Sequence, residues 1–482
     1  MDNLQNSTLG NILWKLFERV GAQLISFVVQ LVLARLLMPD EFAVIAIVTV
    51  FISIFNVFIT NGLGTALIQK KDADDLDFST VLIFNTLFSG AIYGILFLIA
   101  PMVAAFYGRA NLTPILRVLG IQILLSGFKT VQQAYVARKL IFRRFFWATL
   151  IGTITSGVVG VSMAYSGAGP WALVAQHLTN SAIDVLILML TIGWKPKLQY
   201  SGERLKPLAK FGWKILASAL VNNIYNNLRT LVIGKKYSGE DLAYFNRGQQ
   251  IPDLIYDNTA VSIESVLFPV MSKVQDDIAH LCSMTRRFIK ECSYIMIPML
   301  AGVAVVAEPM VNVLLTEKWQ PAIPYIQIYC IVRMFGPMQI ANMQIPKALG
   351  RSDISLRVEI IKKVVGLLIL LVSMHFGVIW IALSNLVYSV FVLIINAYYS
   401  KKLIGYGLWQ QVSSVLPTAA VTLVMAVAVY AVRFTGLPDL WMLLSQIAVG
   451  ATVYLAISVV FRMEEFTYLV NMLRKRLPSG KK

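Results

Sequence analysis

Charged side chains within apolar stretches are the residues of this sequence whose types could do chemistry. A charge buried in hydrocarbon is costly, so each such residue indicates a binding role, with an ion pair between helices as the structural alternative. The planar guanidinium of arginine can hold two oxygens of a phosphate or carboxylate at once. Five residues therefore predict a cationic cavity that binds an anionic group: Arg19, Lys129, Arg229, Arg247 and Arg333.

A second reading stays open for the lysines. Lys129, Lys362 and Lys363 lie nearer the ends of apolar runs than the arginines do. A long lysine side chain in such a place can extend its ammonium group to the membrane surface while its carbon chain stays in the apolar phase. The sequence alone does not decide between this arrangement and a place in the cavity.

Carboxylates accompany the cations. Asp253, Asp257 and Glu264 recur at spacings of about one helical turn or its multiples, so they share one face of a predicted helix. Glu18 stands next to Arg19 in the first apolar run. These acids either neutralise the arginines when the cavity is empty or bind a coupling proton or sodium ion, and both roles remain open.

Amides and a tyrosine gather just before the acidic helix. Asn222, Tyr225 and Asn226 lie within two helical turns, and Gln23 lies on a polar stripe of the first apolar run. Amides offer both donors and acceptors, which sugar hydroxyls require. The same groups also serve as hydrogen bonds between membrane helices, so sugar contact and helix packing are the two alternatives.

The elements that must position these side chains are membrane-spanning helices. Of the 482 residues, 57% are hydrophobic and 14% are charged, and the mean hydropathy is +0.70, which excludes an ordinary soluble enzyme. Because a bilayer core of about 30 Å needs about 20 apolar residues per helix, the apolar runs predict an all-α integral membrane protein with about fourteen spans. The predicted spans cover residues 10–37, 42–68, 78–106, 112–135, 146–165, 170–192, 209–233, 242–271, 289–315, 322–349, 354–375, 378–400, 412–432 and 440–461.

The loops between these spans alternate in charge. Residues 138–144 and 195–210 are rich in lysine and arginine, whereas the loops at 166–169 and 375–377 contain neither. Positive charge marks the cytoplasmic side, so both termini are predicted to be cytoplasmic and the number of spans even. The first residues lack the pattern of a signal peptide, so the first helix is expected to stay in the protein.

Two halves of the chain show a similar pattern. Trp14-Lys15 opens the first predicted span and Trp213-Lys214 opens the seventh, and each pair is followed by a polar stripe. Copies separated by six spans enter the membrane in the same direction, which predicts two parallel six-helix lobes around a central cavity. The expected parts are an N-terminal lobe (1–195), a C-terminal lobe (196–402), an additional helix pair (403–463) and a basic cytoplasmic tail (464–482).

Four segments carry more specific motifs. They are LARLLMPDEF at 33–42, NGLGTALIQK at 61–70, AYFNR at 243–247 and LFPVM at 267–271. Together they resemble the polysaccharide-transport branch, with its Wzx-type flippases, of the multidrug, oligosaccharidyl-lipid and polysaccharide exporter superfamily. One departure is the pair Phe42-Ala43, where such families often show Tyr-Gly.

The resemblance implies a flippase that is not an enzyme and that works by alternating access in a bacterial inner membrane. Its implied cargo is an undecaprenyl-pyrophosphate-linked oligosaccharide repeat unit, destined for exopolysaccharide, capsule or O-antigen-type surface glycan. The cationic cavity would then match the charge of the pyrophosphate. Expected partners are the lipid-linked oligosaccharide and membrane lipids, with a coupling cation and glycan polymerase machinery as further candidates.

Three other functions stay open on the sequence. A drug antiporter of the same superfamily would favour carboxylates and aromatics over arginines in its cavity. A membrane glycan polymerase or ligase would need a sizeable external loop with catalytic groups, and a non-transporting scaffold would not need the arginines at all. The net charge of +17 comes without a nucleic-acid module, and the three cysteines and three histidines show no ligand spacing, so no nucleic acid, metal or cofactor is expected.

Overall fold

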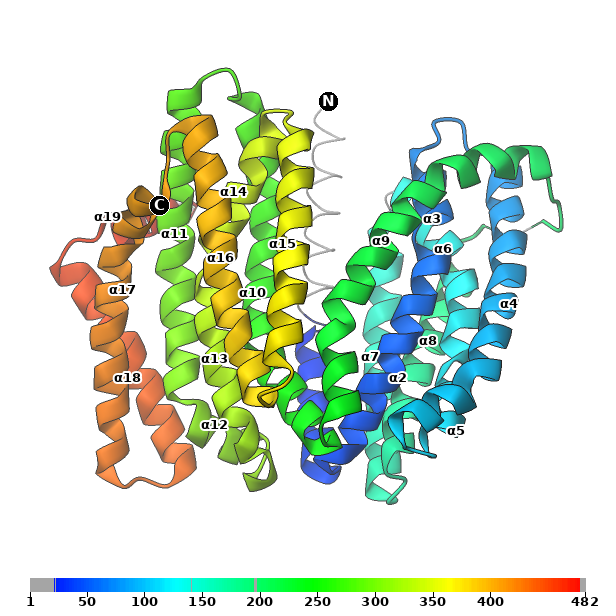
Figure 1. Cartoon of the computed structure of the whole chain (residues 1–482), viewed down its shortest axis with the longest axis horizontal. Coiled ribbons are helices and arrows are strands. Elements are labelled where there is room, and N and C mark those ends of the chain that lie inside the picture. The colour runs from blue at the N-terminus through cyan, green and yellow to red at the C-terminus, as the bar shows by residue number, and fades with distance from the viewer. Residues whose placement is uncertain (1–20, 22, 140, 195–196, 477–482) are drawn as a thin grey trace, which may run out of the picture. The chain divides into compact units, whose positions relative to one another are not determined.

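The computed structural model is helical throughout the part of the chain that it describes (Figure 1). It describes residues 21, 23–139, 141–194 and 197–476, and of these it gives residues 142–145, 261–266, 469 and 472–476 by their backbone only. Contacts divide the chain into two compact units, residues 1–243 and 244–482. The four-part division into lobes, helix pair and tail stays a prediction.

Unit 1 contains an apolar helix at Gln23–Leu36 and the helices up to the middle of the chain. Within it, α7 packs along α8, α4 along α6, and α9 along α2. The bounds are α2 (Pro39–Thr60), α3 (Leu63–Gln69), α4 (Asp75–Tyr107), α5 (Leu112–Leu119), α6 (Ile121–Lys139), α7 (Phe142–Tyr165), α8 (Pro170–Thr191) and α9 (Gly202–Lys236).

Unit 2 takes most of α10 (Gly239–Lys273) and every later helix. In this unit α11 packs against both α13 and α17, and α16 packs against α13, α14 and α15. The bounds are α11 (Ile278–Val305), α12 (Ala307–Leu314), η1 (Glu317–Ala322), α13 (Ile323–Met334), α14 (Gly336–Ala348), α15 (Ser352–Ser373), α16 (Val378–Ile404), α17 (Leu408–Ala431), η2 (Val432–Thr435), α18 (Asp439–Val460) and α19 (Glu464–Arg476).

Nine helical stretches of the described chain are long and apolar enough to cross a membrane. They match the second to sixth, the ninth and the last three predicted spans, which confirms a multi-pass helical membrane protein. Helices α9 and α10 have 35 residues each and α15 has 22, so they are long enough to span but contain more polar residues. The total of fourteen spans stays a prediction.

Local sequence explains where the helices of unit 1 begin and how closely they pack. Asp74 caps α4 by accepting a hydrogen bond from the backbone N–H of Asp77 at 3.0 Å. Gly62 has φ +127°, and a Cβ atom on it would lie 3.2 Å from the carbonyl oxygen of Gly212 in α9. These two glycines therefore let α9 approach the turn between α2 and α3 at backbone distance.

The tenth predicted span is broken into α13 and α14. Gly336 and Pro337 begin α14, and proline has no N–H group to continue the ladder of α13. A Cβ atom on Gly336 would lie 2.4 Å from the ring of Tyr256 in α10. The break thus brings the end of α13, with Arg333, close to α10.

The C-terminal helix pair, α17 and α18, packs beside α11 (Figure 1). Buried polar contacts tie this pair to the rest of unit 2. Asn342 of α14 and Gln411 of α17 exchange two hydrogen bonds of 2.9 and 3.0 Å. On α11, Tyr294 donates to Ser458 of α18 at 2.7 Å, and Tyr454 donates to the carbonyl of Tyr294 at 2.7 Å. Hydrogen bonds of this kind fix the positions of membrane helices, because an apolar side chain is about as stable against lipid as against protein.

Candidate functional site

The amide-rich segment of α9 divides into two faces. Asn222 and Asn226 are exposed, as are Ser218 and Lys214, which lie one and two turns before Asn222. Asn223 instead accepts a hydrogen bond from Ser53 of α2 at 3.2 Å, and Asn227 donates to the backbone carbonyl of Asn223 at 2.9 Å. Two predicted sugar contacts thus lie on the exposed face, while their neighbours pack α9 onto α2.

Tyr225, Arg229 and Gln23 are half-buried members of unit 1. The hydroxyl of Tyr225 and the side-chain oxygen of Asn56 are buried, and neither has a hydrogen-bond partner among the described residues. A buried polar atom without a partner is costly, so it marks a place where a ligand, water or another side chain is expected. The roles of Tyr225, Arg229 and Gln23 as cargo contacts stay predictions.

Lys129 forms an ion pair inside unit 1. Its ammonium group lies 2.5 Å from Asp184 of α8, whose side chain is 6% exposed. Gly152 of α7 gives this carboxylate room, because a Cβ atom there would lie 2.8 Å from an oxygen of Asp184. For a lysine in a membrane helix, an ion pair of this kind is the structural alternative to a binding role, and cargo binding by Lys129 stays a prediction.

Arg333 and Asp253 form the corresponding ion pair of unit 2. The guanidinium of Arg333 donates to one oxygen of Asp253 at 2.6 Å and lies over the ring of Tyr256, 4.6 Å from its centre. Both partners are partly exposed, at 26% and 22% of their side chains, and Asp257 one turn along is exposed. A cation, two carboxylates and an aromatic ring therefore share one accessible face of α10 and α13.

Arg247 is held more tightly than Arg333. It is 6% exposed, donates to the side chain of Gln250 at 2.7 Å, and lies 4.9 Å from the ring centre of the fully buried Trp319. A guanidinium stacked on an aromatic face gains from the ring's negative charge and loses access to other anions. Cargo contact by Arg247 remains a prediction, and it would require Gln250 or Trp319 to move.

Three predicted residues cannot be placed. Arg19 and Glu18 lie outside the described residues, and the side chain of Glu264 is likewise not described. Lys362, by contrast, is buried and forms an ion pair of 2.5 Å with Glu359 one turn before it. Among the described residues no group of three or more histidine, cysteine, aspartate or glutamate side chains could hold a metal ion.

Two aromatic residues next to the charges were missed by the sequence reading. Tyr256 lies three residues after Asp253, so helical periodicity could have placed it on the same face. Trp319 lies in η1, far from Arg247 along the chain, and no spacing rule indicates that contact. The structure thus adds a cation–π contact to each of the two candidate arginines of unit 2, Arg247 and Arg333.

A multi-pass helical membrane protein with an accessible ion pair at Arg333 and Asp253 is typical of membrane transporters. A family model described as "Polysaccharide biosynthesis protein" matches residues 32–324, more than half of the chain. The chain belongs to this family.

Relatives of known name agree with this assignment. The chain is 22% identical to the lipopolysaccharide biosynthesis protein WzxC of Escherichia coli, over 88% of this chain and 89% of that one. It is 24% identical to the teichuronic acid biosynthesis protein TuaB of Bacillus subtilis, over 61% of each chain. The succinoglycan biosynthesis transport protein ExoT of Rhizobium meliloti is 22% identical, over 67% of this chain and 65% of that one.

Solved structures show the same fold. The lipid II flippase MurJ in its inward closed conformation matches with a TM-score of 0.75, 14% identity, and coverage of 93% of this chain and 98% of that one. An inward-facing multidrug transporter of the MATE family matches with a TM-score of 0.62 and 13% identity, over 79% and 95%. The names of the relatives describe polysaccharide biosynthesis and transport, and the solved structures show the fold that this chain shares.

Proposed function

We propose that this protein translocates an undecaprenyl-pyrophosphate-linked oligosaccharide repeat unit across a bacterial inner membrane by alternating access. The exported units would be assembled into a surface glycan such as exopolysaccharide, capsule or O-antigen. Both termini would lie in the cytoplasm, and the protein would have no catalytic step of its own.

The observation that best supports this proposal is the Arg333–Asp253 pair. In an empty cavity Asp253 neutralises the guanidinium, which would otherwise be a costly isolated charge at membrane depth. Because both side chains are partly exposed, an arriving pyrophosphate can take the place of Asp253 and bind two nitrogens of Arg333. Asp253, once released, can bind a proton or a sodium ion, which would couple cargo binding to an ion gradient.

The exposed face of α9 supplies the second part of the proposal. Asn222 and Asn226 offer amide donors and acceptors to sugar hydroxyls, and Lys214 and Ser218 extend the same polar face along the helix. An exposed polar face suits a large, hydrated cargo. Its lipid tail can remain in the bilayer while the headgroup passes.

A drug antiporter is the alternative that has a specific observation in its favour. Multidrug transporters share the fold, and Asp253, Asp257 and Tyr256 are groups that a cationic drug would bind. The pairing of Asp253 with Arg333 favours anionic cargo instead, because a cationic drug would gain no contact from the guanidinium. A glycan polymerase or ligase has no such observation.

The test is complementation of a flippase-deficient strain, with surface glycan and lipid-linked precursor as readouts. The double variant Arg333→Gln with Asp253→Asn removes both charges, so neither side chain is left as an unpaired charge. We expect loss of surface glycan and accumulation of precursor on the cytoplasmic side, at wild-type amounts of membrane protein. The matched control is Arg351→Gln with Asp353→Asn, an exposed arginine–aspartate pair of the same unit, which should export normally.

Two results would count against the proposal. Normal export by the double variant would make the Arg333–Asp253 pair structural. Resistance to cationic drugs that depends on Asp253, with glycan export unchanged, would favour the antiporter. Measuring both phenotypes in the same strains separates the two functions.

A further inference from the structure

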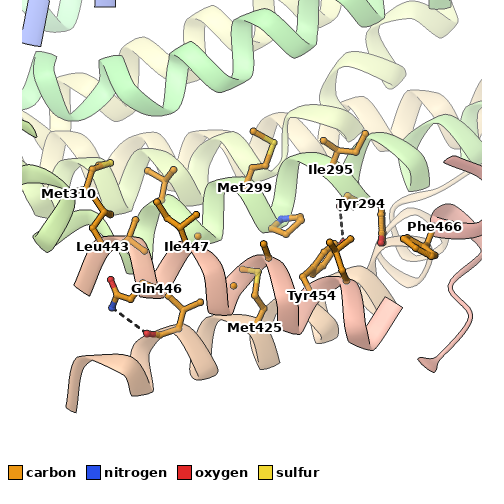
Figure 2. A pocket seen from close by; sticks show the side chains of 18 of the residues that line it. Tyr294, Ile295, Met299, Met310, Met425, Leu443, Gln446, Ile447, Tyr454 and Phe466 are labelled. Carbon is orange, nitrogen blue, oxygen red and sulfur yellow. Dashed lines mark hydrogen bonds between the residues drawn. The ribbon is translucent and has the colours of Figure 1, made fainter. Parts of the chain in front are cut away.

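Unit 2 contains cavities between the C-terminal helix pair and α11 that the transport proposal does not use. Figure 2 shows one of about 640 Å³, bounded by α11, α12, α17, α18 and α19. Its described lining is uncharged, and the amide of Gln446 is already bonded to the carbonyl of Val429 at 3.2 Å. This cavity can accommodate apolar groups, but its described lining has no charged side chain that would select one ligand over another.

A second cavity combines an apolar wall with a charged rim. It has a volume of about 660 Å³, within the usual range for a ligand site. Its wall is formed by α17 and α18, and the residues that matter here are Pro417, Ala420, Val421, Val424, Ile457 and Phe461. Both helices are long and apolar enough to cross a membrane, which would place this wall in the hydrocarbon phase near one membrane surface.

Four charged residues form the rim where α18 ends and α19 begins. They are two cations, Lys290 and Arg462, and two carboxylates, Glu464 and Glu465. Lys290 lies 3.0 Å from Glu464, whose side chain is 85% exposed. A lysine ammonium has three donors, so this exposed ion pair leaves two of them for another acceptor.

Glu465 is the unusual member of the rim. It is 8% exposed and lines both this cavity and a neighbouring one of about 360 Å³. Among the described residues no hydrogen bond or ion pair to its carboxylate is found, in contrast to Glu464 and Glu291, which both have cationic partners. Arg286, Arg287 and Lys290 also line the neighbouring cavity, but among the described residues none of them is within ion-pair distance of Glu465. A largely enclosed carboxylate without a donor gains when a cation with N–H groups binds beside it.

We propose that this groove binds a zwitterionic phospholipid that has a primary amine, as in phosphatidylethanolamine. The ammonium group of the lipid donates hydrogen bonds to Glu465, and its phosphate lies between Lys290 and Arg462. An acyl chain covers the wall formed by α17 and α18. The equal number of cations and carboxylates on the rim matches a headgroup with one charge of each sign.

The primary amine distinguishes this headgroup from those of other phospholipids. A quaternary ammonium, as in phosphatidylcholine, has no N–H group and cannot donate to Glu465. An anionic headgroup such as phosphatidylglycerol satisfies the two cations, but its hydroxyl groups are neutral donors and place no positive charge beside the Glu465 carboxylate. The rim therefore predicts a preference for the amine, independent of whether the protein flips any cargo.

The test measures lipid binding by the purified full-length chain. Delipidated protein is incubated with phosphatidylethanolamine, phosphatidylcholine or phosphatidylglycerol of identical acyl chains, and retained lipid is counted by native mass spectrometry. A charge-assisted hydrogen bond predicts about a tenfold preference for phosphatidylethanolamine over phosphatidylcholine. Glu465→Gln should abolish this preference, whereas Glu317→Gln, which changes an exposed glutamate elsewhere in the unit, should preserve it.

A second pair of variants tests the apolar wall. Ala420→Trp fills the groove from an exposed position of α17 and should reduce retention of every phospholipid, whereas Leu423→Trp, exposed but outside the groove, should not. Equal binding of the three lipids by the wild type would overturn the proposal, as would an unchanged preference in Glu465→Gln. Retention that Ala420→Trp does not reduce would place the lipid elsewhere and overturn it as well.

Discussion

The two membrane ion pairs of this protein have similar distances and different surroundings. Lys129 and Asp184 in unit 1 lie 2.5 Å apart, and Arg333 and Asp253 in unit 2 lie 2.6 Å apart. The cations are equally exposed, at 26% of their side chains, but the carboxylates differ: Asp184 is 6% exposed and Asp253 is 22% exposed. Accessibility of the acid therefore distinguishes the two pairs.

The neighbours of each pair explain this difference. Asp184 is enclosed because Gly152 lets α7 lie directly against it, and one of its oxygens has no hydrogen-bond partner among the described residues. Asp253 is accompanied by an aromatic ring at Tyr256 and by the exposed Asp257. An enclosed pair can only hold helices together, whereas an accessible pair can exchange its partner for a ligand.

The largest effect is expected from breaking the enclosed pair. Asp184→Leu leaves the Lys129 ammonium without its partner, which should lower the free energy of unfolding by about 3 kcal/mol. The measurement is denaturant-induced unfolding of the purified protein in mixed micelles. The compensating double variant, Asp184→Leu with Lys129→Met, removes both charges and should recover most of that stability. If the single variant unfolds like the wild type, the enclosed pair is not a structural one.

Breaking the accessible pair should cost less. Asp253→Leu leaves Arg333 with the ring of Tyr256 and with access to water, so we expect a loss of about 1–2 kcal/mol in the same unfolding assay. A loss as large as that of Asp184→Leu would contradict the distinction between the pairs. Adding inorganic pyrophosphate offers a further check, because an anion that binds the released guanidinium should stabilise Asp253→Leu more than the wild type.

The amides of α9 allow an enclosed residue to be compared with an exposed one where no charge is involved. Asn223→Ala removes the acceptor of Ser53 and should lower the free energy of unfolding by about 1 kcal/mol. Asn226→Ala changes an exposed residue and should change stability by less than about 0.5 kcal/mol, while it reduces glycan export in the complementation assay. The opposite assignment, with Asn223 affecting export and Asn226 affecting stability, would mean that the exposed face of α9 is not the functional one.

Much of this architecture is predictable from sequence for a physical reason. The thickness of the hydrocarbon core fixes the length of an apolar helix, so the stretches at Asp75–Tyr107 and Pro170–Thr191 agree with the predicted spans to within a few residues. Helical periodicity likewise separates Asn222 and Asn226 from Asn223 and Asn227. Periodicity does not say which of the two faces packs, because amides suit both environments.

The ion pairs could not be predicted in the same way. Lys129 and Asp184 are 55 residues apart and Arg333 and Asp253 are 80 residues apart, and nothing in the local sequence selects these partners among the other charges. Pairing depends on helix packing, such as the room that Gly152 gives Asp184 and the break at Gly336 that brings α13 to α10. Sequence identified the charged residues, and the fold determines which of them remain accessible.

The smallest effect is expected from an arginine–aspartate pair at the surface of unit 2. Arg351 donates two hydrogen bonds of 3.0 Å to the carboxylate of Asp353, and this contact lowers the pKa of Asp353 from 3.8 to about 2. A carboxyl group whose pKa is lower in the folded state stabilises that state above its unfolded pKa, and the contribution is lost as the pH falls from about 4 to about 2.

Comparison of the wild type with Asp353→Asn checks this expectation. The difference in unfolding midpoint should be small at neutral pH, should shrink further with added salt, and should vanish as the pH falls below 2, because the wild-type carboxylate is then protonated in the folded state as well. Both partners are about half exposed, so water screens this pair, whereas protein encloses Asp184. A surface variant as damaging as Asp184→Leu would show that contact distance, rather than accessibility, determines what these pairs contribute.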